Sequence, residues 1–426
     1  MPPLSLLIIG AGNRGAGYAT AAQIAPERVR IAGVADPREH YRQAMAQTYG
    51  VPARNVFADW REAASRPRFA DAVVIATPDA LHTEPAIAFA RLGYAMLLEK
   101  PMAPSAEECR RIVQAVEASG IIFAVGHVLR YTPYTRQIKA LLAAGALGDV
   151  VSLQHLEPVG YWHFAHSFVR GNWRNEALSS PVLLAKSCHD LDWIRHVMGV
   201  PCQAVSSFGS LRHFRRESQP AGAADRCLDC AVEADCPYSA RKIYLGRVAQ
   251  GQVGWPVDVL TPDVTAEGVE AALRTGPYGR CVYTCDNDVL DNQVVQMQFQ
   301  GGRTASFSLI AFTEAGPRRT TICGTAGELT CDGRTIRVFN FQTDTWREID
   351  VASLTAGQPG SHAGGDFGLM DAFLMAVATG DPSAILSGPQ ESLESHLMVF
   401  AAEQARHEGR VMPVRPAYSN ERSAIG

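Results

Sequence analysis

The junction between an apolar run at residues 4–9 and a glycine-rich turn constrains the fold of this chain more than any other part of its sequence. The turn places glycines at positions 10, 12 and 15, and an alanine-rich segment follows it. A second apolar run, at residues 29–35, ends in Asp36. This succession of strand, glycine turn, helix, strand and acid predicts a βαβ unit that binds a dinucleotide.

The three glycines have separate roles in such a unit. Gly10 permits the tight turn, Gly12 lets the backbone approach a pyrophosphate, and Gly15 lets the helix pack against the strand. The start of the helix, at Asn13 and Arg14, is expected to face the phosphates.

The residue that ends the second strand bears on the choice of cofactor. The Asp36 carboxylate can accept hydrogen bonds from the adenosine ribose diol and would repel a 2′-phosphate, so we expect NAD. Arg38 lies close enough in the chain to accommodate that phosphate, which keeps NADP as the alternative.

Size and composition are typical of a soluble protein with two domains. The chain has 426 residues, of which 47% are hydrophobic and 19% charged, and its net charge is −4. This charge gives no reason to expect a nucleic-acid or anionic-membrane partner. No apolar run reaches the ~18 residues of a membrane helix. The N-terminal run also lacks the basic lead of a secretion signal, which favours a cytoplasmic location.

Residues 1–127 alternate apolar runs with helical patterns, which predicts a doubly wound parallel α/β sheet of the Rossmann type. Ser105, followed three residues later by Glu108, indicates a helix-capping box. Strands are expected at 5–9, 30–35, 72–76, 95–99 and 121–125, and helices at 38–49, 83–92 and 105–119.

Polar clusters follow two of these predicted strands. One contains Thr77, Pro78 and His82, and the other contains Glu99 and Lys100 followed by a proline. Ligands lie at the carboxyl ends of strands in an open parallel sheet, so both clusters should face the same crevice as the glycine turn. The proline favours an extended backbone at Lys100, which would direct the lysine out of the sheet end.

The Gly10-x-Gly12-x-x-Gly15 turn, Thr77-Pro78 with His82, and Glu99-Lys100-Pro101 together resemble the glucose–fructose oxidoreductase, inositol dehydrogenase and MocA (Gfo/Idh/MocA) family. The resemblance covers the N-terminal domain and resumes at 127–133, at 186–199 and in the final helix and strand. It implies a Rossmann domain followed by an α/β domain with a large, mostly antiparallel open sheet. It also implies that NAD or NADP is used on sugars, inositols or related polyols, with Lys100 contacting the nicotinamide ribose and the reacting hydroxyl.

A second domain is expected from residue 128 to residue 416, and it contains an unusual polar and aromatic run at 161–175. Aromatic faces can stack on a sugar ring while fixed donors bind its hydroxyl groups, so we expect the run to line a substrate pocket. The alternative is a surface loop with aromatic anchors. The arginines could also hold a carboxylate, phosphate or sulfonate. The expected pocket residues are Tyr131, His163, His166, Arg170, Trp173, Arg174 and Lys186.

A helix predicted over residues 183–197 carries His189 and Asp192 on one face. It is similar to the family's catalytic helix, Asp-x-Gly-x-His-x-x-Asp, in its last two positions, but the first acid is Ala185 here and the glycine is a serine. The resemblance implies that His189 takes a hydroxyl proton while Lys100 stabilises the alkoxide, with Asp192 orienting the imidazole. The alternative is a histidine bonded to Asp192 for structure alone.

Five of the ten cysteines lie in an insertion expected at about 211–285. In a reducing compartment, grouped cysteines indicate a metal more than disulfides. We expect a closed, structural zinc site, with an iron–sulfur cluster as the second choice because a proline follows Cys236, and disulfides as the third. Cys285 is a fifth candidate for four places. The expected ligands are Cys227, Cys230, Cys236 and Cys281.

In the rest of the second domain, short predicted strands are followed by two long predicted helices, at 367–378 and 390–407. The exposed face of an open sheet favours a homo-oligomer. Residues 357–365, which include His362, are expected to be a flexible loop, and residues 417–426 a disordered tail. Strands are expected at 150–156, 294–299, 304–311, 320–323, 327–331, 335–339 and 411–414, and helices at 134–144, 367–378 and 390–407.

These patterns predict an NAD-dependent oxidoreductase that transfers hydride at a ring carbinol of a sugar, glycoside or inositol-like polyol. One alternative is an NAD-dependent glycoside hydrolase, in which transient oxidation acidifies a neighbouring C–H, the aglycone is eliminated, water adds, and the ketone is reduced again. The additional acid–base groups at His163, His166 and Lys186, and the acid missing at Ala185, are consistent with it. The other alternative is a non-catalytic NAD sensor, which the retained lysine and histidine argue against.

Overall fold

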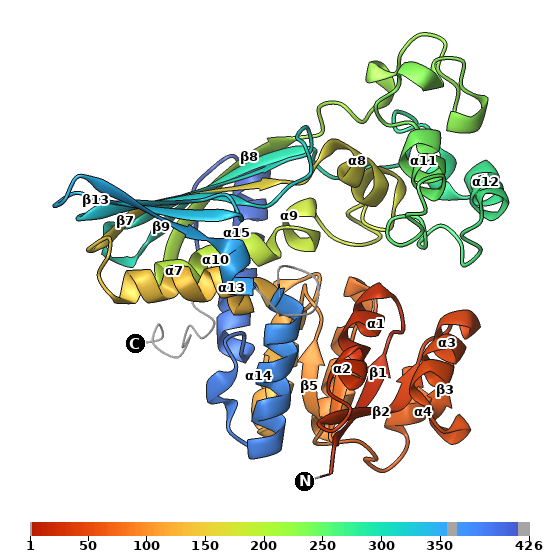
Figure 1. The fold of residues 1–426 in the computed structure, drawn as a ribbon, viewed down its shortest axis with the longest axis horizontal. Helices are drawn as coiled ribbons and strands as arrows, with labels where there is room; N and C mark the ends of the chain where they lie inside the picture. The colour runs from red at the N-terminus through yellow and green to blue at the C-terminus, as the bar shows by residue number, and fades with distance from the viewer. Residues whose placement is uncertain (1, 356–363, 416–426) are drawn as a thin grey trace, which may run out of the picture.

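Two β-sheets organise the part of the chain that the computed structural model describes, residues 2–355 and 364–415 (Figure 1). The N-terminal sheet has six parallel strands in the order β3-β2-β1-β4-β5-β6. The C-terminal sheet has nine strands in the order β14-β13-β12-β11-β7-β10-β9-β8-β15, and within these described strands β7 and β10 are the parallel pair. The predicted fold class is confirmed: a Rossmann domain is joined to an α/β domain with a mostly antiparallel sheet.

The Rossmann strands are nearly continuous runs of buried apolar residues, because helices cover both faces of a parallel sheet. Ser105 accepts a hydrogen bond from the Glu108 amide and caps α6, as the capping pattern predicted. Strand β3, which has two residues, was not predicted. The strands are β1 (Leu4–Ile9), β2 (Val29–Ala35), β3 (Val56–Phe57), β4 (Ala72–Ile75), β5 (Ala95–Leu98) and β6 (Phe123–Val125), and the helices are α1 (Asn13–Ala19), α2 (Ala21–Ile24), α3 (Glu39–Tyr49), α4 (Trp60–Ala64), α5 (Thr83–Arg91) and α6 (Ala106–Ser119).

The strands of the large sheet alternate buried and exposed residues, as expected for a sheet with one covered face. Two strands were not predicted, β8 and β14, and β14 is exposed along nearly its whole length. The strands are β7 (Val150–Pro158), β8 (Cys202–Ser210), β9 (Asn292–Phe299), β10 (Thr304–Ile310), β11 (Arg319–Gly324), β12 (Gly327–Cys331), β13 (Thr335–Asn340), β14 (Thr345–Asp350) and β15 (Met412–Pro413).

The helix predicted over 183–197 is divided at Lys186 and Ser187 into two helices, a short α9 and a longer α10. This break matters because it sets the direction of the polar side chains before His189. The α-helices of this half of the chain are α7 (Pro133–Ala143), α8 (Tyr161–Phe164), α9 (Val182–Ala185), α10 (Cys188–Met198), α11 (Gly246–Val248), α12 (Ala266–Thr275), α13 (Val351–Thr355), α14 (Gly365–Thr379) and α15 (Pro389–Glu408).

The C-terminal helices bind the two sheets into one body. Leu369 and Phe373 of α14 pack in the same core cluster as the β1 residues Leu6 and Ile8, and Figure 1 shows α14 beside the Rossmann sheet. Helix α15 packs between α6 of the first domain and α10 and β8 of the second. A division at residue 127 therefore separates the two sheets, but α14 belongs to the Rossmann domain by packing.

The segment between β8 and β9, residues 211–291, contains the predicted insertion, and we call it the insert. It holds short helices around a small core of its own, and Figure 1 shows it extending from the end of the large sheet, opposite α1 and α3. The described helices include none that combines the length and hydrophobicity of a bilayer-crossing segment. The expectations for His362 and for the tail at 417–426 fall outside the described residues.

Candidate active site

The glycine-rich turn lies at the carboxyl end of β1, and its packing explains two of the glycines. Gly10 has a φ of +92°, and a Cβ there would lie 2.5 Å from the carbonyl oxygen of Ala76. A Cβ at Gly15 would lie 1.9 Å from the Gly10 carbonyl oxygen, because α1 crosses directly over the turn. At Gly12, by contrast, a Cβ would meet one atom within 4 Å, Nη2 of Arg38 at 3.3 Å. The backbone at Gly12 is therefore open for a diphosphate to approach.

Asp36 is buried at the end of β2 and is held from both sides. Its carboxylate accepts the Ala11 amide at 2.8 Å, and it accepts hydrogen bonds from the Arg38 guanidinium at 3.0 and 2.9 Å. Burial opposes ionisation, but these hydrogen bonds hold the pKa of Asp36 below its ordinary value. Arg38 keeps 55% of its side chain exposed, so an accessible cation stands beside the acid.

Glu99, which precedes Lys100 in the chain, is a buried carboxylate held by several hydrogen bonds. It pairs with Nε of Arg14, accepts the Tyr18 hydroxyl at 2.9 Å, and accepts the Lys100 amide at 2.5 Å. Burial would raise the pKa of Glu99, but Arg14 and Lys100 hold it below the ordinary value. Arg14 also donates 2.8 Å to Asp366 of α14. Arg14 and Glu99, both predicted to bind cofactor, are thus fully engaged in fixing the end of β5.

The two polar clusters that follow β4 and β5 do lie together. His82 is fully buried, and its Nδ1 and Nε2 contact the carbonyl oxygens of Pro101 and Thr77 at 2.8 and 2.9 Å. Asp79 of the first cluster is also buried, and burial raises its pKa although His82 and Lys100 act against the shift. The sequence pattern did not single out Asp79 as a site residue.

Lys100 reaches from the Rossmann domain to the second domain. Its Nζ donates 2.8 Å to the carbonyl oxygen of Ala185, the last residue of α9. Ala185 occupies the position at which the family pattern has an acid, so the lysine contacts backbone where a carboxylate would stand. His189 lies in the first turn of α10, which begins three residues after Ala185.

Asp192, predicted to orient His189, is held by a buried arginine. Its two oxygens accept hydrogen bonds of 2.7 Å each from the buried Arg130 guanidinium, and Nε2 of His127 lies 3.6 Å away. Burial would raise the pKa of Asp192, but Arg130 and His127 hold it below the ordinary value. The helical spacing predicted that His189 and Asp192 share one face, but it could not predict that Asp192 pairs with Arg130.

His127 was not predicted as a site residue, although it follows β6 at the same sheet edge. Its ring lies 6.0 Å from that of His189 and 5.4 Å from that of His396. Neither ring nitrogen has a hydrogen-bond partner among the described residues. Burial lowers its pKa to about 3, despite the nearby Asp192. The strand-end rule that selected Lys100 could also have selected this histidine.

A buried ionic network surrounds Lys186, in the break between α9 and α10. Lys186 lies 3.3 Å from Glu157 of β7, and Arg318 lies 3.0 Å from the other oxygen of Glu157. Arg318 also bonds Asp190, which His155 contacts at 3.1 Å. Lys186 was predicted as a site residue. Its partners come from β7 and from the segment before β11, and no local sequence pattern predicted them.

The histidines and Tyr131 from the predicted pocket differ in what they contact. Tyr131 is buried and bonds Ser387 at 2.9 Å, which joins the two domains. His166 bonds Tyr244 at 3.0 Å within the insert, and burial lowers its pKa to about 3. His163 packs edge-on against Trp255, and burial and then Lys186 lower its pKa. Of these three, His163 is the one near the ionic network.

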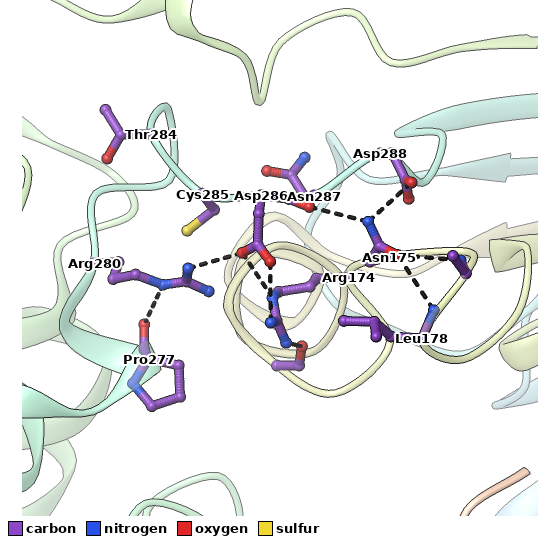
Figure 2. Close-up of polar contacts among 12 residues, drawn as sticks. Arg174, Asn175, Leu178, Pro277, Arg280, Thr284, Cys285, Asp286, Asn287 and Asp288 are labelled. Carbon is purple, nitrogen blue, oxygen red and sulfur yellow. Dashed lines mark hydrogen bonds and ion pairs between the residues drawn. The ribbon is translucent and has the colours of Figure 1, made fainter. Parts of the chain in front are cut away.

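The remaining members of the aromatic run face the insert. Figure 2 shows Arg174 and Arg280 directed at the same carboxylate, that of Asp286. Arg174 donates to it at 2.8 and 3.1 Å, and these bonds hold the pKa of Asp286 well below its usual range. Arg170 is fully buried and donates 3.3 Å to the sulfur of Cys227, and Trp173 is partly exposed. Arg170 and Arg174 therefore anchor the insert.

The structure does not support the predicted zinc site. Among the described residues, no three histidine, cysteine, aspartate or glutamate side chains stand close enough to hold one metal ion. The ten cysteines are all free thiols. Four of the grouped cysteines do line a common cavity: Cys227, Cys230, Cys236 and Cys281.

Comparisons with known proteins agree with this architecture. A model described as an oxidoreductase family with an NAD-binding Rossmann fold matches residues 4–127, and the C-terminal α/β domain model of the same family matches residues 139–414. The levoglucosan dehydrogenase structure in complex with NADH and L-sorbose has a TM-score of 0.72 at 19% identity, over 98% of this chain and 100% of that chain. This similarity shows a shared fold.

Sequence relatives match shorter segments. Inositol 2-dehydrogenase from Streptomyces avermitilis is 31% identical over 206 residues, which are 48% of this chain and 55% of that protein. The 2,7-anhydro-N-acetylneuraminate hydratase of Escherichia coli is 29% identical over 147 residues, which are 34% of this chain and 38% of that protein. The chain thus spans about half or less of each of these curated relatives.

Proposed function

Because the chain belongs to the Gfo/Idh/MocA oxidoreductase family, we propose that it is an NAD-dependent enzyme that moves hydride at a ring carbinol of a sugar, glycoside or inositol-like polyol. The observation that carries the proposal is the hydrogen bond from the Lys100 ammonium, just after β5, to the carbonyl oxygen of Ala185, just before helix α10. The names of the relatives, among them inositol 2-dehydrogenase and levoglucosan dehydrogenase, support the same substrate class. NAD supplies the hydride acceptor when it is bound.

The protein's part in this chemistry is to move a proton and to stabilise charge. The ammonium of Lys100 can donate to the substrate oxygen and stabilise the alkoxide that forms there. His189 accepts the hydroxyl proton in the oxidative direction. Glu99 accepts the backbone amide of Lys100 and so helps to hold this residue in place. Asn13 and Thr77 complete the cofactor edge in this proposal.

A second candidate is redox-neutral cleavage or hydration of a glycosidic or anhydro bond on the same site. The ionic network at Lys186 favours it, because Lys186 and Glu157 put a cation and an anion 3.3 Å apart beside α10. Elimination needs a base and an acid in addition to the pair that serves oxidation. A relative named 2,7-anhydro-N-acetylneuraminate hydratase also supports it.

One experiment separates the two candidates. A panel of polyols, free sugars and aryl glycosides is incubated with NAD or NADP, and both NADH absorbance and released products are followed. Net oxidation predicts NADH in proportion to the oxidised product. Redox-neutral cleavage predicts product that requires added NAD while NADH does not accumulate. If no compound turns over and the Lys100→Ala/His189→Ala double variant retains the cellular phenotype, the protein is a sensor and both proposals are wrong.

We also propose that the open face of the large sheet pairs with a second copy of the chain. Phe208 of β8 and Val294 of β9 are cross-strand partners, and their side chains are 65% and 38% exposed. An exposed apolar pair on a sheet face indicates a covering partner. Phe208→Glu should shift the mass measured by light scattering toward the monomer. A cytoplasmic location is proposed with it, since ten unpaired thiols suit a reducing compartment.

A further inference from the structure

Four thiols of the insert converge on one cavity that neither sheet explains. Cys227, Cys230, Cys236 and Cys281 line a cavity of about 130 Å³. The first three come from a stretch of ten residues, and the fourth comes from more than forty residues further along the chain. All four are free thiols.

The backbone holds the two distant thiol segments together. Arg226 and Arg280 form an isolated antiparallel bridge, and the amide of Cys281 donates 2.8 Å to the carbonyl oxygen of Asp225. Cys227 and Cys281 follow the bridged residues directly and are both buried. Their convergence is therefore fixed by main-chain pairing, independently of any bond between the sulfurs.

A buried cation faces the same cavity without an acidic partner. Arg170 lines the cavity and is fully buried, and its Nη1 has no hydrogen-bond partner. Its Nη2 donates 3.3 Å to the sulfur of Cys227. The other hydrogen bonds of Arg170 go to the carbonyl oxygens of Arg280 and Tyr238, and Glu233 of the cavity wall already bonds Ser239. An uncompensated buried guanidinium costs several kcal/mol, so the cavity calls for a net anion.

Among the described residues, the thiols are not grouped so as to hold a single ion. Thiolates around zinc all lie ~2.3 Å from the metal, yet no three of these ligand-type side chains stand close enough to hold a single ion. A cluster of iron and sulfide holds its four thiolates further apart, around a core of its own volume. With four thiolates as ligands such a cluster is a net anion, which matches the unpaired charge of Arg170.

We propose that Cys227, Cys230, Cys236 and Cys281 bind an iron–sulfur cluster, with Arg170 as its buried counter-charge. The site is structural, since it lies in the insert and away from Lys100. The cluster would stabilise the insert, which contains short helices and only a small core. Cys285 is not a ligand, because it does not line the cavity and its sulfur lies 3.3 Å from the Cys281 carbonyl oxygen.

The first test is the content of the full-length protein. The chain is produced and purified without oxygen, and iron, acid-labile sulfide and zinc are measured per chain. We expect about four iron atoms and four sulfides, visible charge-transfer absorbance, and an electron paramagnetic resonance signal after reduction with dithionite. Zinc as the sole metal, or a metal-free protein that stays metal-free after incubation with ferrous iron and sulfide, would overturn the proposal.

Matched variants locate the ligands. Cys227→Ser and Cys281→Ser should lose most of the iron and sulfide, whereas Cys285→Ser and the sheet variant Cys323→Ser should retain wild-type content. Equal loss in Cys285→Ser would contradict the assigned ligand set. If the ligand variants do not fold, the metal and sulfide content of the wild-type protein still decides the matter.

The role of Arg170 has a readout of its own. Reduction adds negative charge to the cluster, so removal of a neighbouring cation should make reduction harder. Arg170→Gln is expected to move the reduction potential to more negative values, and Arg170→Lys to leave it close to wild type. An unchanged potential in Arg170→Gln would exclude the counter-charge role.

Discussion

The ammonium of Lys100 and the backbone carbonyl of Ala185 are joined by a hydrogen bond of 2.8 Å that links the two domains. Lys100 follows β5 of the Rossmann sheet, and Ala185 ends α9 of the second domain. The family pattern has an acid at the position of Ala185. Here this position offers the lysine only a backbone carbonyl. At this contact Lys100 therefore meets a neutral backbone oxygen, and we propose that its ammonium acts on a substrate oxygen.

Replacement of Lys100 should stop the chemistry and spare the fold. We expect Lys100→Met to lower kcat by about 10²- to 10⁴-fold, the usual loss for a group that transfers a proton or stabilises developing charge. Binding of NAD, followed by fluorescence titration, should change little. Lys242→Met, at an exposed lysine of the insert, is the matched control and should leave kcat unchanged. A fully active Lys100→Met protein would contradict the proposed function.

His189 and Asp192 should behave differently, although the sequence pattern pairs them. His189→Gln is expected to lower kcat by about 10²-fold or more with an unchanged unfolding midpoint. Asp192→Asn leaves the buried Arg130 guanidinium without its carboxylate, and should destabilise the protein by about 3–5 kcal/mol. Urea denaturation measures the second effect. A stable Asp192→Asn protein with only a kcat defect would restore the role predicted from the sequence.

The pair formed by Asp36 and Arg38 should set the preference between NAD and NADP. Asp36→Ala removes an acceptor for the ribose diol and frees the guanidinium, so kcat/KM with NAD should fall about 10- to 100-fold, which corresponds to about 1.5–3 kcal/mol of charge-assisted hydrogen bonding. The same variant should gain activity with NADP. Arg38→Ala is the companion variant, and it should lower any NADP activity while retaining use of NAD. Equal losses with both cofactors in Asp36→Ala would refute this assignment.

Buried neutral histidines should make the protein less stable in mild acid. Burial lowers the pKa of His127 and His166 to about 3 and that of His196 and His396 to about 4. The unfolded chain binds these protons near pH 6.5, before the folded protein does. Stability is therefore fully present above about pH 6.5 and is lost as the pH falls toward the folded values, by up to about 1.4 kcal/mol per pH unit for each histidine.

Urea denaturation between about pH 7.5 and pH 5 measures this dependence of stability on pH, because carboxylates with ordinary pKa values titrate below that window. His166→Phe should reduce the loss of stability per pH unit by about the contribution of one histidine. His40→Gln, at an exposed position, should leave it unchanged. A stability independent of pH across this range would show that the four imidazoles are not held neutral.

The sequence by itself predicted the parallel sheet, the glycine turn and the lysine after β5. These features rest on contacts within a few residues: apolar runs long enough to be buried strands, a glycine at Gly15 where a Cβ has no room, and a strand end that must face a ligand. The two strands that were missed, β8 and β14, and the short β3 had too weak a local pattern.

Only the tertiary structure decided what each polar side chain contacts. Arg170, expected in the substrate pocket, is buried against Cys227, and Asp192 accepts hydrogen bonds from Arg130. A charged or hydrogen-bonding group takes the partner that burial brings nearest, and that partner comes from a segment tens to hundreds of residues away. Helical spacing fixes the face on which a side chain lies, while the fold determines which residue lies opposite it.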